Sequence, residues 1–320
     1  MTLHHARRRR KIMAKKVLGL NFGRVNGNCK MFLTAALEAA KAEGAEVELI
    51  DTIKLKITHC IGCGACSRML QGGKEQISCI QKDDYEPLAD AVLAADAIIV
   101  AAPVYVLQPT GQLMNFVHRF GPAHDKAYML FENELRKETG GVELNPDCLK
   151  RHLVSYISVG GATTPNWVSY GIPGMNLFGM SINMKVVDQL NAYGSYQPDR
   201  KEMLLAESER IGRHMVEAMD QKTSEIKWES EPGVCPSCHC NEMTIDPNGS
   251  TKVSCPICGI YGEIKIVDGK LKVEFTDAEL RRSRLRFTGV LEHQVEQGRK
   301  DRYPNFDRYV EKFTALQDEM

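Results

Sequence analysis

Lys16-Val-Leu-Gly-Leu-Asn21, followed by Phe22-Gly-Arg-Val-Asn-Gly-Asn28, is the stretch of sequence that decides the fold. A short apolar run closed by a small polar loop predicts a buried strand that ends in a tight turn. Residues 29–43 then place apolar side chains at helical spacing, and Gly44 is a natural helix C-terminus. Residues 46–50 predict a second strand, and a helix between two strands implies that the strands run parallel.

The same alternation of strand and helix continues along the chain. Residues 97–102 form a continuous apolar run, typical of the centre of a parallel sheet. Further strands are predicted at 153–159 and 180–188, with helices at 85–95, 111–120 and 200–221. This pattern predicts a doubly wound α/β fold with a five-stranded parallel sheet over residues 15–225. The polar segment 121–150 is expected to be an irregular insertion that folds as a lid over a ligand.

Charge and composition narrow the class of protein. The 320 residues carry a formal net charge of zero, which gives no general attraction to nucleic acid or membrane. The most apolar stretch, 91–107, is interrupted by Asp96 and Pro103, so we expect no membrane-spanning helix. Residues 1–14 are rich in arginine and are expected to form a disordered basic tail. Clustered cysteines without an apolar leader favour a reducing, cytoplasmic compartment.

The loop after the first predicted strand has the composition of an anion site. Backbone N–H groups at the start of a helix, with the helix dipole behind them, suit a phosphate dianion. Glycines permit the tight backbone path, and asparagine and arginine side chains supply further donors. The candidate residues are Asn21, Gly23, Arg24, Asn26, Gly27 and Asn28. A plain turn that enters a helix is the alternative.

Two groups of cysteines have metal-binding spacing. Cys60, Cys63, Cys66 and Cys79 have the spacing of a [4Fe–4S] site, in a glycine-rich loop spanning 60–79. Structural zinc or free thiols are the alternatives.

The second group is Cys235, Cys238, Cys255 and Cys258. Its spacing is that of a zinc ribbon, and rubredoxin-type iron is the alternative metal. We expect this four-cysteine module to cover residues 233–275 and to include a hairpin around Asp268-Gly269. His239 and Cys240 are not expected to be ligands. Residues 276–320 are charged and are predicted to form a helical C-terminal tail.

Arg24, Gly27 and Asn28 resemble the phosphate loop of the NAD(P)H-dependent FMN reductase and iron–sulfur flavoprotein family, which usually reads Gly-Ser-Pro-Arg-x-x-Gly-Asn-Thr. Pro103-Val104-Tyr105 and Gly160-Gly161 resemble its two other flavin loops. The first cysteine group, followed by Asp83-Asp84, resembles its cluster motif. The resemblance covers about residues 16–220. Its departures are Asn21, Phe22, Gly23 and Cys29 in the loop, the long gap before Cys79, and Met114 and His118 where the family usually has Lys and Asp.

The resemblance implies a flavodoxin-like oxidoreductase with FMN and an iron–sulfur cluster. Electrons would come from NAD(P)H or a ferredoxin and pass to a small organic acceptor, quinone-like or otherwise unsaturated. His118 and His124 are candidate proton donors near the flavin. The family also implies a homodimer or homotetramer. The alternative function is a non-catalytic scaffold whose zinc ribbon binds a protein or nucleic-acid partner.

Overall fold

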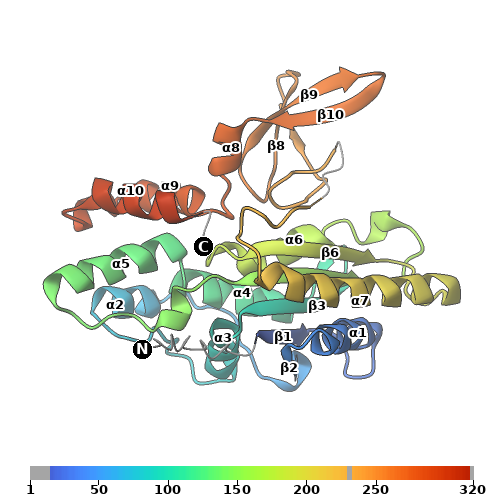
Figure 1. Ribbon diagram of the computed structural model, residues 1–320, viewed down its shortest axis with the longest axis horizontal. Coiled ribbons are helices and arrows are strands. Elements are labelled where there is room, and N and C mark those ends of the chain that lie inside the picture. The colour runs from blue at the N-terminus through green and yellow to red at the C-terminus, as the bar shows by residue number, and fades with distance from the viewer. Residues whose placement is uncertain (1–14, 229–232, 318–320) are drawn as a thin grey trace, which may run out of the picture.

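A parallel β-sheet forms the centre of the computed structural model, which describes residues 15–228 and 233–317 (Figure 1). Its strand order is β2-β1-β3-β5-β6, and each of these strands runs parallel to its neighbour. This order confirms the predicted doubly wound, flavodoxin-like α/β fold. The predicted basic tail, 1–14, lies outside the described residues.

The strands follow the apolar runs of the sequence. They are β1 (Lys16–Asn21), β2 (Glu46–Asp51), β3 (Ala97–Tyr105), β4 (Gln108–Pro109), β5 (Leu153–Val159) and β6 (Lys185–Ala192). The short β4 turns back and pairs antiparallel with the end of β3. The expected strand at 180–188 was placed too early, because Met180 ends a helix and the apolar run that contains it belongs partly to that helix.

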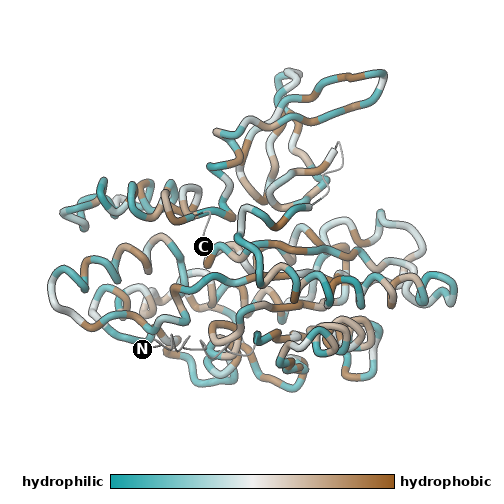
Figure 2. Tube along the Cα trace, in the orientation of Figure 1, coloured by the Kyte–Doolittle hydropathy of each residue, from teal (hydrophilic) through white to brown (hydrophobic). Residues whose placement is uncertain are grey.

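Helices cover both faces of the sheet. One face carries α1 (Asn28–Ala42) and α7 (Pro198–Met219), which pack against each other. The other face carries α3 (Tyr85–Ala94), α4 (Gly111–Ala123) and α6 (Gly171–Met180). Each face has its own hydrophobic core. Figure 2 shows hydrophobic residues along the central strands and hydrophilic ones on the outer sides of the helices.

Short helical segments connect these elements. They are η1 (Thr52–Lys54), α2 (Ala65–Gln71), η2 (Pro146–Cys148), η3 (Pro165–Trp167) and η4 (Lys300–Arg302).

Residues 121–150 are not the irregular lid that their polarity suggested. They continue α4 and then form α5 (Lys126–Thr139), whose residues Lys126–Asn133 are buried. The Phe131 ring is surrounded by aromatic rings of the C-terminal helices. The Glu132 carboxylate pairs with Arg302 and accepts from the Tyr303 hydroxyl at 3.0 Å. The charged residues of this segment thus find partners far along the chain, so polarity alone did not mark an exposed loop.

The C-terminal part contains a second sheet, which is antiparallel and has the order β10-β9-β8-β7. Its strands are β7 (Thr244–Ile245), β8 (Lys252–Ser254), β9 (Tyr261–Val267) and β10 (Lys270–Phe275). Asp268 and Gly269 join β9 to β10 with φ angles of 50° and 72°, as the predicted two-residue hairpin requires. Then follow α8 (Asp277–Arg281), α9 (Phe287–Glu296) and α10 (Phe306–Leu316), with α9 and α10 packed on α5 (Figure 1).

Candidate cofactor and metal sites

The loop between β1 and α1 is held by Asn21 at the end of the strand. Its side chain donates to Asp51 Oδ1 at 2.9 Å and accepts from the Gly23 N–H at 3.0 Å. Gly27 precedes the first turn of α1, and no side chain among the described residues caps that turn. Uncapped N–H groups at a helix start attract anions. The local structure therefore suits the phosphate site that the sequence predicts, with the Arg24 and Asn26 side chains exposed beside it.

Asn28, in the first turn of α1, joins this loop to the turn after β6. Its side-chain amide donates to the backbone oxygen and the hydroxyl of Ser195 at 3.1 and 3.0 Å. Ser195 and its neighbour Tyr196 are not among the predicted site residues, because the fifth strand was predicted several residues too early. The small residues Gly194 and Ser195 directly after β6 were the signal that could have revealed this turn.

The second loop is a tight hairpin between β3 and β4. Val106 and Leu107 occupy it with φ angles of 51° and 72°, a backbone region that β-branched residues rarely adopt. The hairpin exposes Tyr105 (58%) and Val106 (93%) at the carboxyl edge of the sheet, while Pro103 stays buried. Strained backbone of this kind gathers at ligand sites, where the surrounding structure holds it in place.

The third loop follows β5 and begins with Gly160-Gly161. A side chain on Gly161 would come within 2.6 Å of the Tyr196 ring, so this glycine lets the loops after β5 and β6 approach each other. The Tyr170 N–H donates to the Leu107 oxygen at 3.0 Å and ties this loop to the hairpin. The three predicted flavin loops therefore meet at one edge of the sheet.

Four large aromatic side chains are exposed on the loops of this edge. They are Tyr105 (58%), Trp167 (67%), Tyr170 (54%) and Tyr196 (71%). Exposed aromatic groups on the carboxyl-edge loops of a doubly wound sheet suit a planar ligand, because rings stack on rings. The edge thus combines an anion site with aromatic surface, as a flavin nucleotide requires.

The two candidate proton donors lie along and just after α4, with His118 on the helix and His124 directly after its last residue. The His118 side chain is exposed. His124 is 2% exposed, lies against the Phe120 ring at 4.4 Å, and its Nδ1 is 3.1 Å from the Phe120 oxygen. Burial lowers the pKa of His124 to about 4, so this imidazole is neutral near pH 7. Its enclosure argues against proton donation to a substrate, and the catalytic role of either histidine stays a prediction.

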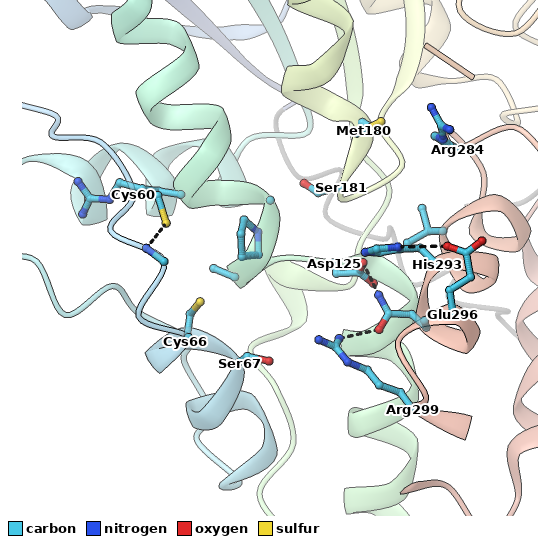
Figure 3. Close-up of a pocket in the computed structure, with 18 of the residues that line it drawn as sticks. Cys60, Cys66, Ser67, Asp125, Met180, Ser181, Arg284, His293, Glu296 and Arg299 are labelled. Atoms are coloured by element: carbon cyan, nitrogen blue, oxygen red, sulfur yellow. Dashed lines mark hydrogen bonds and ion pairs between the residues drawn. The ribbon is translucent and has the colours of Figure 1, made fainter. Parts of the chain in front are cut away.

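The first cysteine group lines a cavity of about 880 Å³, which we call the cysteine cavity (Figure 3). Its cysteine ligand candidates are Cys60, Cys63, Cys66 and Cys79. Burial raises the pKa of the Cys66 thiol. The neighbouring thiols of Cys60 and Cys63 raise it further, but more weakly. The opposite wall comes from α9 and from the ribbon, including Cys258 and Tyr261. Four thiols around one large cavity suit a multi-iron cluster, which holds its ligands farther apart than a single ion does.

A buried arginine also faces the cysteine cavity. Arg119, on α4, donates to Asp83 Oδ2 at 2.6 Å, and both side chains are almost fully buried. Burial opposes ionisation of Asp83, but the Arg119 hydrogen bond holds the pKa of this carboxyl well below its usual range. Nε and Nη2 of Arg119 have no hydrogen-bond partner among the described residues. A buried cation with two donor groups that lack acceptors therefore lies beside the cysteine cavity, which fits an anionic metal cluster.

The flavin edge and the cysteine cavity of the same chain meet different parts of α4. Helix α4 starts at that edge with Gly111, and Arg119 is eight residues farther along it. At the rise of an α-helix this separates the two sites by about 12 Å along the helix axis. The resemblance predicts a cluster near the flavin or at a partner chain, and both arrangements stay predictions.

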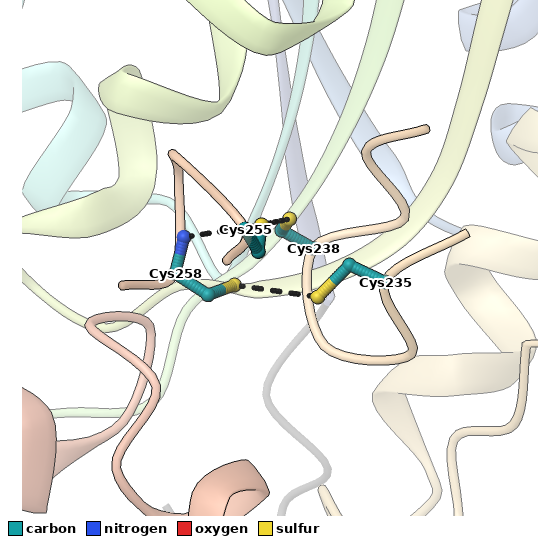
Figure 4. Close-up of side chains that lie close together, drawn as sticks. All are labelled: Cys235, Cys238, Cys255 and Cys258. Atoms are coloured by element: carbon teal, nitrogen blue, oxygen red, sulfur yellow. Dashed lines mark hydrogen bonds between the residues drawn. The ribbon is translucent and has the colours of Figure 1, made fainter. Parts of the chain in front are cut away.

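The second cysteine group forms a compact tetrahedron of sulfurs (Figure 4). The Sγ atoms of Cys235 and Cys258 are 3.8 Å apart, and those of Cys238 and Cys255 are 3.4 Å apart. Four thiolates at about 2.3 Å from a zinc ion are about 3.8 Å from one another. The geometry therefore suits one tetrahedral ion, with His239 outside the group and stacked on Trp228 at 4.0 Å.

Within 15–228 and 233–317, the helices are all too short or too polar to cross a lipid bilayer.

Comparison with known proteins finds similar flavoproteins. Residues 16–144 match the family model of NADPH-dependent FMN reductase. An iron–sulfur flavoprotein of Archaeoglobus fulgidus is 40% identical over 96 residues, which are 30% of this chain and 40% of that protein. The chain thus spans less than half of the length of this relative.

Two relatives match nearly the whole chain, ribbon included. A flavone synthase of Aspergillus candidus is 28% identical over 88% of this chain and 89% of its own. A solved structure of a flavone reductase superposes with a TM-score of 0.73 at 26% identity, and covers 95% of this chain and 93% of that one. Residues 16–144 are therefore similar to the NADPH-dependent FMN reductase family, and the chain is an FMN-dependent oxidoreductase of flavodoxin-like fold.

Proposed function

We propose that this oxidoreductase passes electrons from NAD(P)H, or from a ferredoxin, to a small unsaturated organic acceptor at the carboxyl edge of its sheet. The observation that carries the proposal is the meeting of three loops at that edge. One offers uncapped N–H groups at the start of α1, one is the strained hairpin at Val106, and one is tied to the turn at Ser195. Bound FMN would supply hydride transfer there.

The residues of the edge have separate tasks in this proposal. The loop at Gly23 and Gly27 would hold the phosphate, and Asn28 fixes that loop against Ser195. The hairpin around Tyr105 would position the flavin ring. Trp167, Tyr170 and Tyr196 are exposed, and they would cover a planar acceptor and exclude water from it.

A flavone is the first acceptor to test. The relatives that match most of this chain are a flavone synthase and a flavone reductase. A flavone carries a carbon–carbon double bond conjugated to a carbonyl, and reduction adds two electrons and two protons across that bond. Its flat aromatic rings match the exposed aromatic side chains of the edge. A quinone is the second acceptor class, because it is also planar and takes two electrons.

The metal sites and the assembly complete the proposal. The cysteine cavity would hold a [4Fe–4S] cluster that transfers single electrons, and its sulfur donors and buried cation support this. The ribbon would hold zinc, or iron of the rubredoxin type, as a structural centre.

We also propose a homodimer or homotetramer, since about 12 Å of α4 separates the two redox sites within one chain. A cytoplasmic location stays a prediction.

The test begins with anaerobic purification and analysis of flavin, iron, sulfide and zinc. We then expect anaerobic oxidation of NADH or NADPH to depend on added flavone or quinone, with a product two mass units heavier than the flavone. Trp167→Ala should weaken turnover but keep FMN bound. Ile245→Ala is the matched control, because Ile245 is also exposed (65%) but lies on the ribbon.

Two results would reject the function. A protein that neither contains FMN nor takes it up would be the scaffold that the sequence also allowed. A protein that binds FMN but turns over no acceptor with any donor would lack the proposed electron transfer.

A further inference from the structure

The ion pair of Arg119 and Asp83 has a geometry that a purely structural ion pair does not need. Asp83 is already saturated with donors: it accepts from Arg119, from the Thr58 N–H at 2.9 Å and hydroxyl at 2.7 Å, and from the Tyr85 N–H at 3.2 Å. Arg119 has no matching set of acceptors, because only its Nη1 is engaged. Asp83 therefore anchors one end of the guanidinium and leaves the other end unsatisfied.

Arg119 lies beside the cysteines, with Cys79 the thiol that interacts with its guanidinium. Arg119 and the four cysteines line the same cavity. Its guanidinium lies 4.1 Å above the Tyr85 ring, which limits its rotation. Cys79 is close enough to influence the guanidinium, and its backbone N–H is held by Glu86 Oε1 at 2.6 Å. Buried N–H donors without acceptors, such as Nε and Nη2 of Arg119, are costly unless an acceptor or an anion lies opposite them.

We propose that Arg119, fixed by Asp83, is the buried counter-charge of the cysteine cavity and raises the reduction potential of the cluster held there. This inference rests on the proposed [4Fe–4S] site. A cluster bound by four thiolates carries net negative charge and becomes more negative when one electron is added. A fixed cation therefore stabilises the reduced form more than the oxidised form. Hydrogen bonds to cluster sulfurs and nearby charge are the protein's means of setting this potential.

The test is a redox titration of the reconstituted holoprotein, followed by electron paramagnetic resonance. Arg119→Gln should lower the midpoint potential, and Asp83→Asn should raise it, because the second change leaves the cation without its partner. We expect each change to alter the equilibrium constant for one-electron reduction about tenfold, which is about 59 mV. The double variant restores neutrality and should fall between the two. An ion pair that does not act on the cluster would leave the potential of both single variants at the wild-type value.

The 60–79 segment, which holds the four cysteines, provides a matched control. Arg68 also lies near the thiols, where it donates to the Cys63 oxygen at 3.0 Å, but its side chain is exposed. Arg68→Gln should shift the potential much less, because water screens its charge. The FMN content of each variant reports whether the sheet edge is intact, and iron and sulfide content reports cluster loading.

The outcomes separate this inference from the function that it rests on. If the wild-type protein takes up no iron and sulfide, the cluster assignment fails and the inference with it, while FMN and turnover stand. If the cluster loads but Arg119→Gln keeps the wild-type potential, only the role of Arg119 is overturned. If Arg119→Gln does not load, Asp83→Asn decides alone: a potential equal to or below that of the wild type overturns the proposal.

Discussion

Gly212 sits where α7 crosses α1, and replacing it with alanine tests the packing that supports the flavin edge. A Cβ atom at this position would lie 2.8 Å from the carbonyl carbon of Ala36 and closer still to its oxygen. Both atoms belong to backbone inside α1, so no side chain can rotate away. Overpacking of this kind costs about 1–3 kcal/mol, and a backbone clash belongs at the upper end.

The net effect follows from two opposing contributions. Alanine in a helix gains about 1 kcal/mol over glycine, which reduces a cost of about 3 kcal/mol to about 2 kcal/mol. For the α/β domain, residues 15–225, a net loss of about 2 kcal/mol should lower the midpoint of thermal unfolding by about 4–8 °C. Because α1 carries the phosphate loop at its start, FMN affinity should fall as well.

Circular dichroism during heating and the recovery of FMN fluorescence measure the two effects. Gly121→Ala on α4 is the matched control, since a Cβ there meets nothing within 4 Å. That variant should be neutral or slightly more stable. An unfolding midpoint for Gly212→Ala equal to or above that of Gly121→Ala would refute the assigned packing of α1 on α7.

Three further predictions concern the flavin edge, the ribbon and the dependence of stability on pH. Asn28→Ala removes both hydrogen bonds to Ser195 and should weaken FMN binding by about tenfold, or about 1.4 kcal/mol, in a fluorescence titration; unchanged affinity would mean that this bond does not shape the phosphate loop. Cys238→Ser should abolish metal binding by the ribbon, seen as loss of about one zinc or iron per chain with FMN retained, because the four sulfurs act as one tetrahedral set; full metal content would exclude Cys238 as a ligand. The hydrogen bond from His214 Nδ1 to Asp188 at 2.7 Å raises the pKa of His214. A folded pKa above the unfolded value of about 6.5 stabilises the protein below that value, and the stabilisation is lost as pH rises through the folded pKa. The free energy of unfolding should therefore fall between pH 6 and 8 more in the wild type than in His214→Gln, and equal slopes would contradict the assignment.

Local patterns of sequence determined the sheet and the metal-binding spacings. The apolar runs at 16–21, 97–102 and 153–159 were predicted as buried strands because each is short and nearly continuous, and the structure confirms all three. Gly44 has the positive φ angle of 91° that a helix C-terminus favours, and Asp268-Gly269 makes the predicted hairpin. These features depend on neighbours in the chain, and the sequence shows neighbours directly.

The tertiary structure alone decided how distant segments meet. It buried the polar residues of α5 by pairing Glu132 with Arg302 and Tyr303. It also placed the cysteine cavity beside α9 and the ribbon. A buried charge is stable only with a partner, and nothing in the local pattern shows which of many distant residues that partner is. For this reason the fold and the candidate ligands could be predicted from the sequence, whereas the surroundings of the ligands, Arg119 among them, could not.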